Sequence, residues 1–434
     1  MEIADYSPVQ QPTPDQQRDA LQKGLGRAVQ WAMAGRLDEA VLLEACLHDL
    51  RFDAQVDDCR GDWLSQLIQI VHAEARFHSA ILDSLHKLSD WGTAEQLCEL
   101  AVHYAAAGDA SFRKRLYEIV ATRPLDDLPW LAEKPIIQLD GEQGFLYGAR
   151  IRGQQFESRE WDWDDRCLVE TAAEQFGKDR VAALLDEATD IAINSFSNRW
   201  RQHETAKSSP KGVPRVERMR GIPISEIFSK AESGEPAFGN FRGWGMYATE
   251  ADLNLVGQRL TAATTPGVIA NLLRMFSNRE HLPLVPQFIE LCEHSDNQVR
   301  LRAFAALGMN SDLAIRQFAE VQLRQGLRDA SVTSLFIKNY RQGDEQRILE
   351  SIELPDDVVE LHSMLMDITK VLENNPQADC SELGVLAYAL TPCGNCRFHA
   401  ARLLQKQDVA PSWLWEECRF DAESDTRKLA EETP

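Results

Sequence analysis

Apolar residues spaced four apart form triplets that return at a nearly constant interval through the C-terminal half of the chain. The triplets are Val268/Leu272/Phe276, Val299/Ala303/Leu307, Val332/Phe336/Tyr340, Met364/Ile368/Leu372 and Cys396/Ala400/Leu404, followed by the pair Thr426/Ala430. A four-residue spacing places these side chains on one face of a helix. A fixed period long enough for a pair of helices is typical of repeat proteins, in which each helix pair buries its apolar face against its neighbours. We therefore expect an all-α fold, an α-solenoid of stacked helix pairs.

The pattern also predicts how the chain is divided. Amphipathic helices follow one another from about residue 15 to 122, and further helices are expected up to residue 204. Glycine, proline and aromatic residues crowd residues 205–248, which predicts an irregular, loop-rich insertion. We expect a disordered lead-in at 1–14, an N-terminal helical repeat region at 15–204, the insertion at 205–248 and C-terminal repeats at 249–434. The nearest candidate for a β-strand is the short IIQL after Pro135.

A finer motif pairs an aspartate with an arginine four residues later at the predicted start of several helices. The clearest copies begin at Asp109/Arg113, Asp296/Arg300 and Asp312/Arg316, and two weaker copies keep only Arg397 and Arg427. An aspartate at a helix start caps free backbone N–H groups and favours the positive end of the helix dipole. The copies at Asp296 and Asp312 are separated by only half the usual interval, so the motif falls on consecutive helices there.

This motif resembles the HEAT-repeat family, in which the second helix of a repeat typically begins with Asp, then Val-Arg, then a small Ala and a Leu. DNQVRLRAFAAL (residues 296–307) is the nearest match and CGNCRFHAARLL (residues 393–404) the second. The resemblance covers residues 250–434 well and 15–122 loosely. It implies that Asp296 and Arg300 join a polar ladder between stacked repeats, which makes the motif residues structural.

The amino-acid composition narrows the range of functions that this chain could have. Lys and Arg number 46 against 68 Asp and Glu, which gives a formal net charge of −22. That charge disfavours wholesale binding to nucleic acid or anionic lipid, and it suits solubility or a basic protein partner. No apolar run is long enough to span a membrane, and the acidic, polar N-terminus is not typical of a secretory signal. Nine scattered cysteines favour a reducing compartment, so we expect a cytoplasmic protein.

The sharpest local signal for chemistry is Cys393-Gly-Asn-Cys396 with His399. Two thiolates and an imidazole could bind zinc, with Cys380 or Cys418 as a fourth ligand. Packing is the alternative, because Cys396 occupies an inward apolar position of the pattern and Cys393 stands where Asp296 caps its helix. Redox chemistry of the two thiols is the third interpretation. No cofactor is expected from these residues.

A cationic stretch interrupts this acidic chain just before and within the predicted insertion. Its cations are Arg199, Arg201, Lys207, Lys211, Arg215, Arg218 and Arg220. An aromatic-rich segment follows, with Phe241, Arg242 and Trp244. Exposed Trp and Arg side chains are strong interface anchors, so these ten residues are candidate partner-binding residues. The alternative is that the segment folds back and buries its aromatic residues.

Three functional hypotheses follow. The first is a non-enzymatic scaffold, adaptor or regulatory subunit in a stable complex, which grips a partner protein on a solenoid surface. The second is a helical-repeat protein that binds nucleic acid through residues 198–221 and through concave-face arginines such as Arg300 and Arg302. The third is an enzyme built into residues 125–247, with Asp162, Asp164 or Asp165 in its pocket.

Overall fold

The computed structural model describes residues 6–122, 130–156, 166–208, 215–234, 238–277, 279–280, 282–283, 285–327 and 329–432. Throughout these ranges the regular secondary structure is helical and no β-strand occurs, which confirms the all-α fold class. The IIQL segment lies within a helix, Glu133–Asp140. The chain forms two units. The N-terminal unit comprises residues 8–211 and 416–432, and the C-terminal unit comprises residues 212–415 with residues 1–7.

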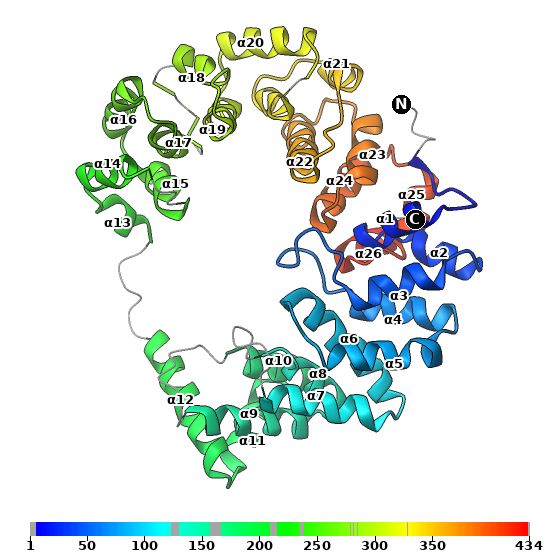
Figure 1. The fold of residues 1–434 in the computed structure, drawn as a ribbon. Coiled ribbons are helices and arrows are strands. Elements are labelled where there is room, and N and C mark those ends of the chain that lie inside the picture. The colour runs from blue at the N-terminus through cyan, green and yellow to red at the C-terminus, as the bar shows by residue number, and fades with distance from the viewer. Residues whose placement is uncertain are drawn as a thin grey trace. The chain divides into compact units, whose positions relative to one another are not determined.

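The N-terminal unit consists of helices that follow one another along the chain (Figure 1). Its helices are α1 (Pro14–Lys23), α2 (Arg27–Met33), α3 (Glu39–Leu47), α4 (Gly61–Ile70), α5 (Glu74–Leu85), α6 (Trp91–Ala106), α7 (Ala110–Thr122), α8 (Glu133–Asp140), α9 (Glu142–Phe156), α10 (Arg166–Phe176), α11 (Lys178–Glu187), α12 (Ile191–Ser208) and α26 (Ser424–Glu431). Helix α6 packs against α4, α5, α7 and α8. Its residues Leu97, Cys98 and Leu100 are fully buried there, so α6 is central to this core.

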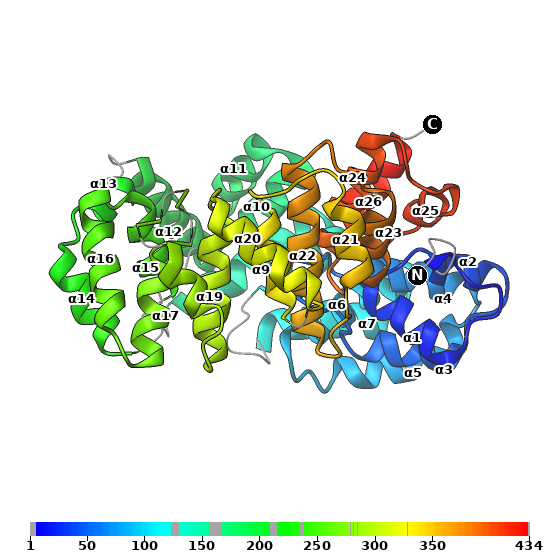
Figure 2. The ribbon, with the colours of Figure 1, turned by 90° about the horizontal axis from the view of Figure 1, so that it is seen from above.

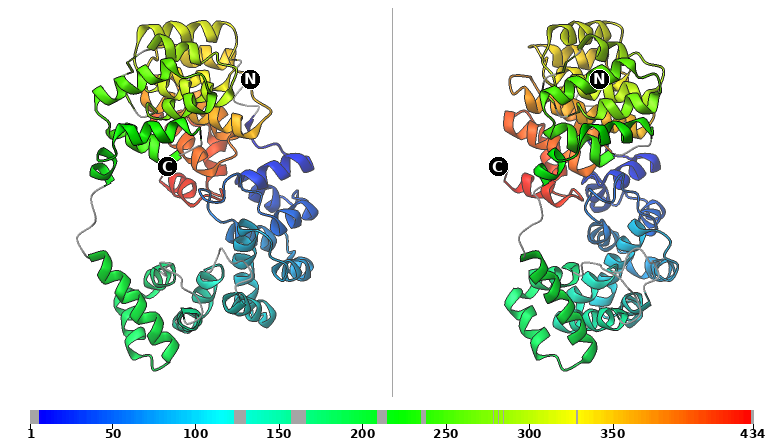
Figure 3. Two further views of the ribbon diagram at one scale, coloured as in Figure 1. Left: turned by 60° about the vertical axis from the view of Figure 1, so that its left-hand side comes forward. Right: turned by 90° about the vertical axis from the view of Figure 1, so that its left-hand side faces the viewer.

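Residues 416–432 complete this unit by packing on its first helices, and Figure 3 shows α26 close to them. Arg27 Nε lies 2.7 Å from Glu417 Oε2, and the Glu417 side chain is fully buried. The indole Nε1 of Trp63 donates to the backbone oxygen of Phe420 at 2.9 Å. A β-carbon on Gly26 would lie 1.9 Å from the Glu417 backbone oxygen, so only glycine permits this approach. Segments that lie far apart in the sequence therefore share one core.

Glu99 on α6 is a carboxyl group inside this unit, and burial raises its pKa. A raised pKa means that folding favours the protonated acid. The contribution of Glu99 to folding stability is therefore fully present below the pKa of its carboxyl in the unfolded chain. It is lost as pH rises through the higher pKa of that carboxyl in the folded protein. Its ion pair with Lys134 is long, 3.6 Å, and the lysine is 58% exposed, so this pair offsets little of the burial cost.

We therefore expect Glu99→Gln, which mimics the neutral acid, to raise the thermal stability of the N-terminal unit at pH 7. The gain should shrink toward zero as pH falls to about 4, where the wild-type carboxyl is protonated in both states. Thermal melts across this pH range measure it. Glu142→Gln is the control, because Arg180 hydrogen-bonds to Glu142 and lowers its pKa, so no gain should follow. A pH-independent effect of Glu99→Gln would contradict the prediction.

The C-terminal unit begins with short helices and continues with the elements that carry the apolar triplets. Its elements are α13 (Arg215–Arg220), α14 (Ile224–Glu232), α15 (Phe238–Tyr247), α16 (Glu250–Ala262), α17 (Pro266–Arg274), α18 (Val285–Leu291), α19 (Asn297–Gly308), α20 (Leu313–Arg324), the 3-10 helix η2 (Ala330–Phe336), α21 (Asp344–Ser351), α22 (Val358–Asn374), α23 (Ser381–Leu390) and α24 (Gly394–Gln407). Helix α25 (Ser412–Cys418) spans the boundary between the units.

Triplet-bearing elements follow one another in packing order. Helix α17 packs against α19, α19 against η2, η2 against α22, and α22 against α24. Figure 2 shows α17, α19 and α22 following one another along this unit. The central members of the triplets are buried in these contacts, namely Leu272, Ala303, Phe336, Ile368 and Ala400. The apolar pattern in the sequence therefore identifies the packed faces correctly.

A row of side-chain amides, which was not predicted from the sequence, links these successive elements. Asn310 Nδ2 donates to the backbone oxygen of Arg279 at 2.9 Å, and Asn339 Nδ2 donates to that of Asn310 at 2.8 Å. Asn375 Nδ2 donates to the Ile337 oxygen at 3.1 Å, and Gln407 Nε2 to the Ala378 oxygen at 2.8 Å. Each amide thus satisfies a carbonyl about one sequence period earlier, which keeps polar backbone groups paired between packed elements.

The aspartates of the Asp–Arg motif cap their helices as predicted. The Asp296 side chain accepts from the Val299 backbone N–H at 3.1 Å, and that of Asp312 accepts from Ala314 at 2.7 Å. Asp109 likewise accepts from the Ser111 N–H at 2.8 Å. The copies at Asp296 and Asp312 do fall on consecutive helices, α19 and α20.

The motif arginines bind acceptors outside their own helices. Arg113 pairs with Asp140, Arg300 Nε lies 3.4 Å from Asp329 Oδ2, and Arg316 pairs with Asp344. In the weaker copies, Arg427 also binds outside its helix, donating to the backbone oxygen of Asp421 at 2.6 Å, and Arg397 is fully buried.

The predicted loop-rich insertion at 205–248 is wrong for most of the residues described there. Helix α12 continues to Ser208, and α13, α14 and α15 follow. Glycine has a packing role here: a β-carbon on Gly245 of α15 would lie 2.0 Å from the Met275 backbone oxygen at the end of α17. Gly245, one of the glycines that suggested a loop, instead permits two helices to approach closely.

Candidate functional site

Three arginines on neighbouring helices of the C-terminal unit form a cationic cluster, comprising Arg242, Arg274 and Arg302. They lie on α15, α17 and α19, and α17 packs against both of the other helices. Burial and then the charge of Arg242 lower the pKa of Arg302, while burial and then the charge of Arg302 lower the pKa of Arg274. Shifted pKa values gather at functional sites, although structural ion networks produce them as well, so this cluster is a candidate site.

Two predicted partner-binding cations lie on α13, a helix that contacts α15. Arg218 and Arg220 are exposed on α13, which packs against the helix that carries the exposed Arg242. The prediction that these three bind a partner stays a prediction.

The other predicted cations belong to the N-terminal unit or lie outside the description. Arg199 is partly buried on α12, and Arg201 Nη2 lies 2.5 Å from Asp186 Oδ1. Lys211 is outside the described residues, and the side chains of Lys207 and Arg215 are not described. The structure therefore does not bring the ten predicted residues together as one described surface.

Phe241 and Trp244 are not exposed anchors. Phe241 is fully buried and Trp244 is 3% exposed. The indole Nε1 of Trp244 donates to the Ile222 backbone oxygen at 3.2 Å, which satisfies its polar atom inside the unit. The alternative stated from the sequence, that this segment buries its own aromatic residues, is correct for both side chains.

The second candidate site is a cysteine–histidine cluster between α22 and α24. Cys393 is the N-cap residue of α24, Cys396 stands in its first turn, and His362 lies on α22, which packs against α24. The ligand atoms of the three residues all lie within 4.8 Å of one another. His362 Nε2 is 3.2 Å from Cys396 Sγ. Hydrogen bonds from Cys396 and from His362 lower the pKa of Cys393 to about 4, against the opposing effect of burial.

The histidine in this cluster is not the one suggested by the sequence. His399 Nδ1 lies 3.0 Å from Glu373 Oε1 and 2.9 Å from Arg402 Nη2, and His399 is not a member of the cluster. Of the suggested fourth ligands, Cys380 Sγ donates to the Leu403 backbone oxygen at 3.6 Å, and Cys418 belongs to the other unit. Packing between helices explains the change, because α22 lies against α24 and carries His362 to the two thiols, whereas His399 is held by Glu373 and Arg402.

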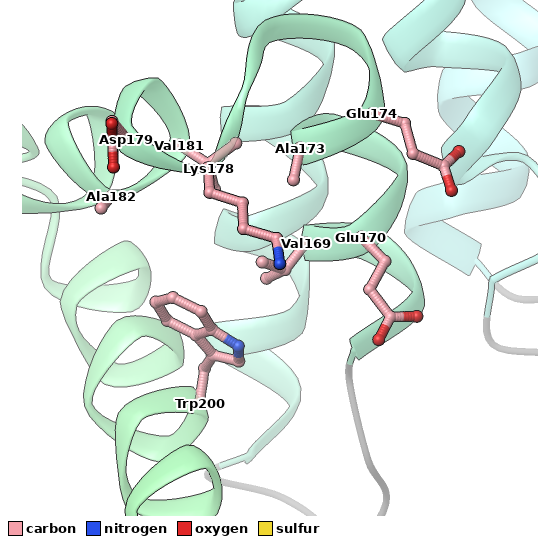
Figure 4. Close-up of a pocket in the computed structure, with 9 residues that line it drawn as sticks. All are labelled: Val169, Glu170, Ala173, Glu174, Lys178, Asp179, Val181, Ala182 and Trp200. Carbon is pink, nitrogen blue, oxygen red and sulfur yellow. The ribbon is translucent and has the colours of Figure 1, made fainter.

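A hollow of about 520 Å³ lies among α10, α11 and α12 of the N-terminal unit. Figure 4 shows Lys178 and Trp200 facing it, with Glu170 and Glu174 at its rim. The other lining residues are Val169, Ala173, Asp179, Val181 and Ala182. Three carboxylates and one lysine line the hollow, so its charged residues carry a formal net charge of −2. Asp162, Asp164 and Asp165, the acids of the enzyme hypothesis, lie outside the described residues.

No protein-family model, curated protein or solved structure was found to match this chain. None of the nine cysteines, all of which lie in the described ranges, forms a disulfide bond. Within the described ranges, no helix combines the length and apolar character needed to cross a membrane.

Proposed function

We propose that this chain is a non-enzymatic, protein-binding α-solenoid of HEAT-like repeats that holds an acidic segment of a partner protein. The proposed contact surface consists of the exposed Arg218, Arg220 and Arg242 together with the partly buried Arg302. The observation that carries the proposal is the cationic cluster itself, which lies on α15, α17 and α19 of a chain whose net charge is −22.

Electrostatics supports an acidic ligand at this cluster. The negatively charged chain repels anions at long range. The group of mutually repelling arginines is a local positive region on it, where an anion would be attracted. An arriving carboxylate would relieve the repulsion between Arg242 and Arg302 and would form charge-assisted hydrogen bonds with guanidinium groups. Such contacts set specificity and association rate, as expected for a subunit that selects one partner.

The packing of the C-terminal unit supports the solenoid part of the proposal. Triplet-bearing elements pack in sequence order, and the amides of Asn310, Asn339, Asn375 and Gln407 connect them. In repeat arrays each unit contacts its neighbours, which creates an extended surface suited to another polypeptide.

The test is affinity capture of the full chain from its native source, with and without nuclease, followed by quantitative mass spectrometry. A stoichiometric protein partner that survives nuclease is expected with the wild type. The triple variant Arg218→Glu/Arg220→Glu/Arg242→Glu should lose at least about 90% of it, since reversed charges repel an acidic segment. The partner's contact peptide, mapped by cross-linking, should be acidic.

A matched control reverses three other exposed cations of the same unit, Arg324, Lys338 and Arg341. It changes the net charge equally and should retain the partner. Equal loss in both triple variants would show a general charge effect and would contradict the proposed surface. Loss of every partner on nuclease treatment would replace the protein-binding proposal with the nucleic-acid hypothesis.

A further inference from the structure

The cysteine–histidine cluster is independent of the arginine surface and offers a different chemistry. Its three side chains come from two packed helices, and each presents a nitrogen or sulfur atom to the same small volume. Cys393 is 4% exposed, while Cys396 and His362 are partly exposed. The cluster is thus anchored in the core on one side and reachable from solvent on the other.

We propose that His362, Cys393 and Cys396 form a binding site for a soft divalent metal ion, Zn²⁺ in the first instance. Thiolate and imidazole are the ligands that zinc prefers in proteins. Zn–S bonds of about 2.3 Å and Zn–N bonds of about 2.0–2.1 Å at tetrahedral angles separate the ligand atoms by roughly 3.5–3.8 Å. The ligand atoms here lie within 4.8 Å of one another, and His362 Nε2 is 3.2 Å from Cys396 Sγ. Shifts of about 1 Å or less in side-chain position bring them to zinc distances.

Charge balance favours occupancy by a divalent ion. With the metal bound, any proton still on a ligand atom has left to solvent, so two thiolates and one neutral imidazole carry a charge of 2−. Zn²⁺ cancels that charge, so the buried sulfur of Cys393 belongs to a neutral complex instead of carrying an uncompensated charge. The local fold supplies this arrangement in advance, because an N-cap residue and the third residue of a helix bring their side chains close together.

The fourth coordination position is open to a ligand from outside. Among the described residues, no further His, Cys, Asp or Glu joins the cluster. Three protein ligands with a free position characterise zinc sites that accept water or an exchangeable ligand, whereas structural sites are closed by four. The partial exposure of Cys396 and His362 gives such a ligand access.

The test uses the full chain, reduced and freed of metal, titrated with Co²⁺ as a spectroscopic probe. We expect one equivalent to give thiolate-to-cobalt charge-transfer bands and the intense d–d bands of tetrahedral cobalt, and Zn²⁺ to displace it. Loss of a residue that only hydrogen-bonds to a metal ligand typically weakens metal binding by roughly 10–100-fold. We expect a larger loss of Co²⁺ affinity in each of the variants Cys393→Ser, Cys396→Ser and His362→Ala, because these residues are the proposed ligands. Circular dichroism verifies that each variant keeps its helical fold, and His362→Asn provides a second, milder variant.

His399→Ala and Cys380→Ser are the matched controls, because both residues lie near the cluster in sequence and neither belongs to it. Both should bind Co²⁺ with wild-type affinity. Loss of binding in His399→Ala with retention in His362→Ala would overturn the proposed ligand set. A reduced wild-type chain that binds no metal, whether or not oxidation joins Cys393 to Cys396, would overturn the proposal itself.

Discussion

Replacing Arg316 with leucine is expected to lower the free energy of unfolding of the C-terminal unit by about 3–5 kcal/mol. Arg316 Nη2 donates to Asp344 Oδ1 at 2.9 Å, and the two side chains are only 5% and 2% exposed. Removal of the arginine leaves a buried carboxylate with less compensation, and this desolvated charge is the main cost. Urea unfolding monitored by hydrogen-exchange mass spectrometry measures the loss separately for each unit.

Arg300→Leu is the matched control, since Arg300 occupies the same place in the motif. Its pair with Asp329 is 3.4 Å long and both side chains are 29% exposed, so we expect a loss of about 1 kcal/mol or less from the pair. The double variant Arg316→Leu/Asp344→Leu should lose less than Arg316→Leu alone, because no buried carboxylate remains. Equal losses at Arg316 and Arg300 would mean that burial does not decide the strength of these pairs.

Ala303→Asp should destabilise the same unit by about 3 kcal/mol or more. Ala303 is fully buried on α19, which packs against α17, α18 and η2. An aspartate there is larger than the alanine it replaces and places a carboxylate among apolar side chains, so both crowding and desolvation oppose folding. The shift in the urea midpoint of the C-terminal unit gives its size.

Ala305→Asp tests whether the destabilisation comes from burial at position 303 or from the addition of any carboxylate to α19. Ala305 is two residues away and partly exposed, so its carboxylate reaches water and the expected loss is much smaller. If Ala303→Asp unfolded at the wild-type urea concentration, the packed face of α19 would be assigned incorrectly.

Much of this fold could be predicted because its signals are local. The four-residue spacing identifies the buried faces of α19 and α22, and an aspartate before an apolar run identifies helix starts such as that of α20. Glycine was misleading because one residue type serves two purposes. A sequence does not reveal whether Gly245 supplies a turn or a close helix contact, and the approach of Met275 decides it.

The candidate sites depend on contacts between elements, which a local pattern does not specify. His399 is nearer to Cys396 in sequence, yet His362 meets the two thiols because α22 packs against α24. A signal was present, since His362 precedes Cys396 by 34 residues, about one period of the pattern. The amide row had a similar signal: its members stand three residues after the buried Leu307, Phe336, Leu372 and Leu404.

The packing of residues 416–432 on the first helices imposes an order on folding during synthesis. Residues 212–415 leave the ribosome after the main part of the N-terminal unit and before the segment that completes it. At about 5–20 residues per second, this delay is roughly 10–40 s. Until it ends, the Arg27 side chain lacks Glu417, and the Trp63 indole lacks its acceptor at Phe420. The N-terminal unit is therefore the first to be translated and the last to be completed, which makes that interval the period when its unfinished surface is most open to chaperones or to misassembly.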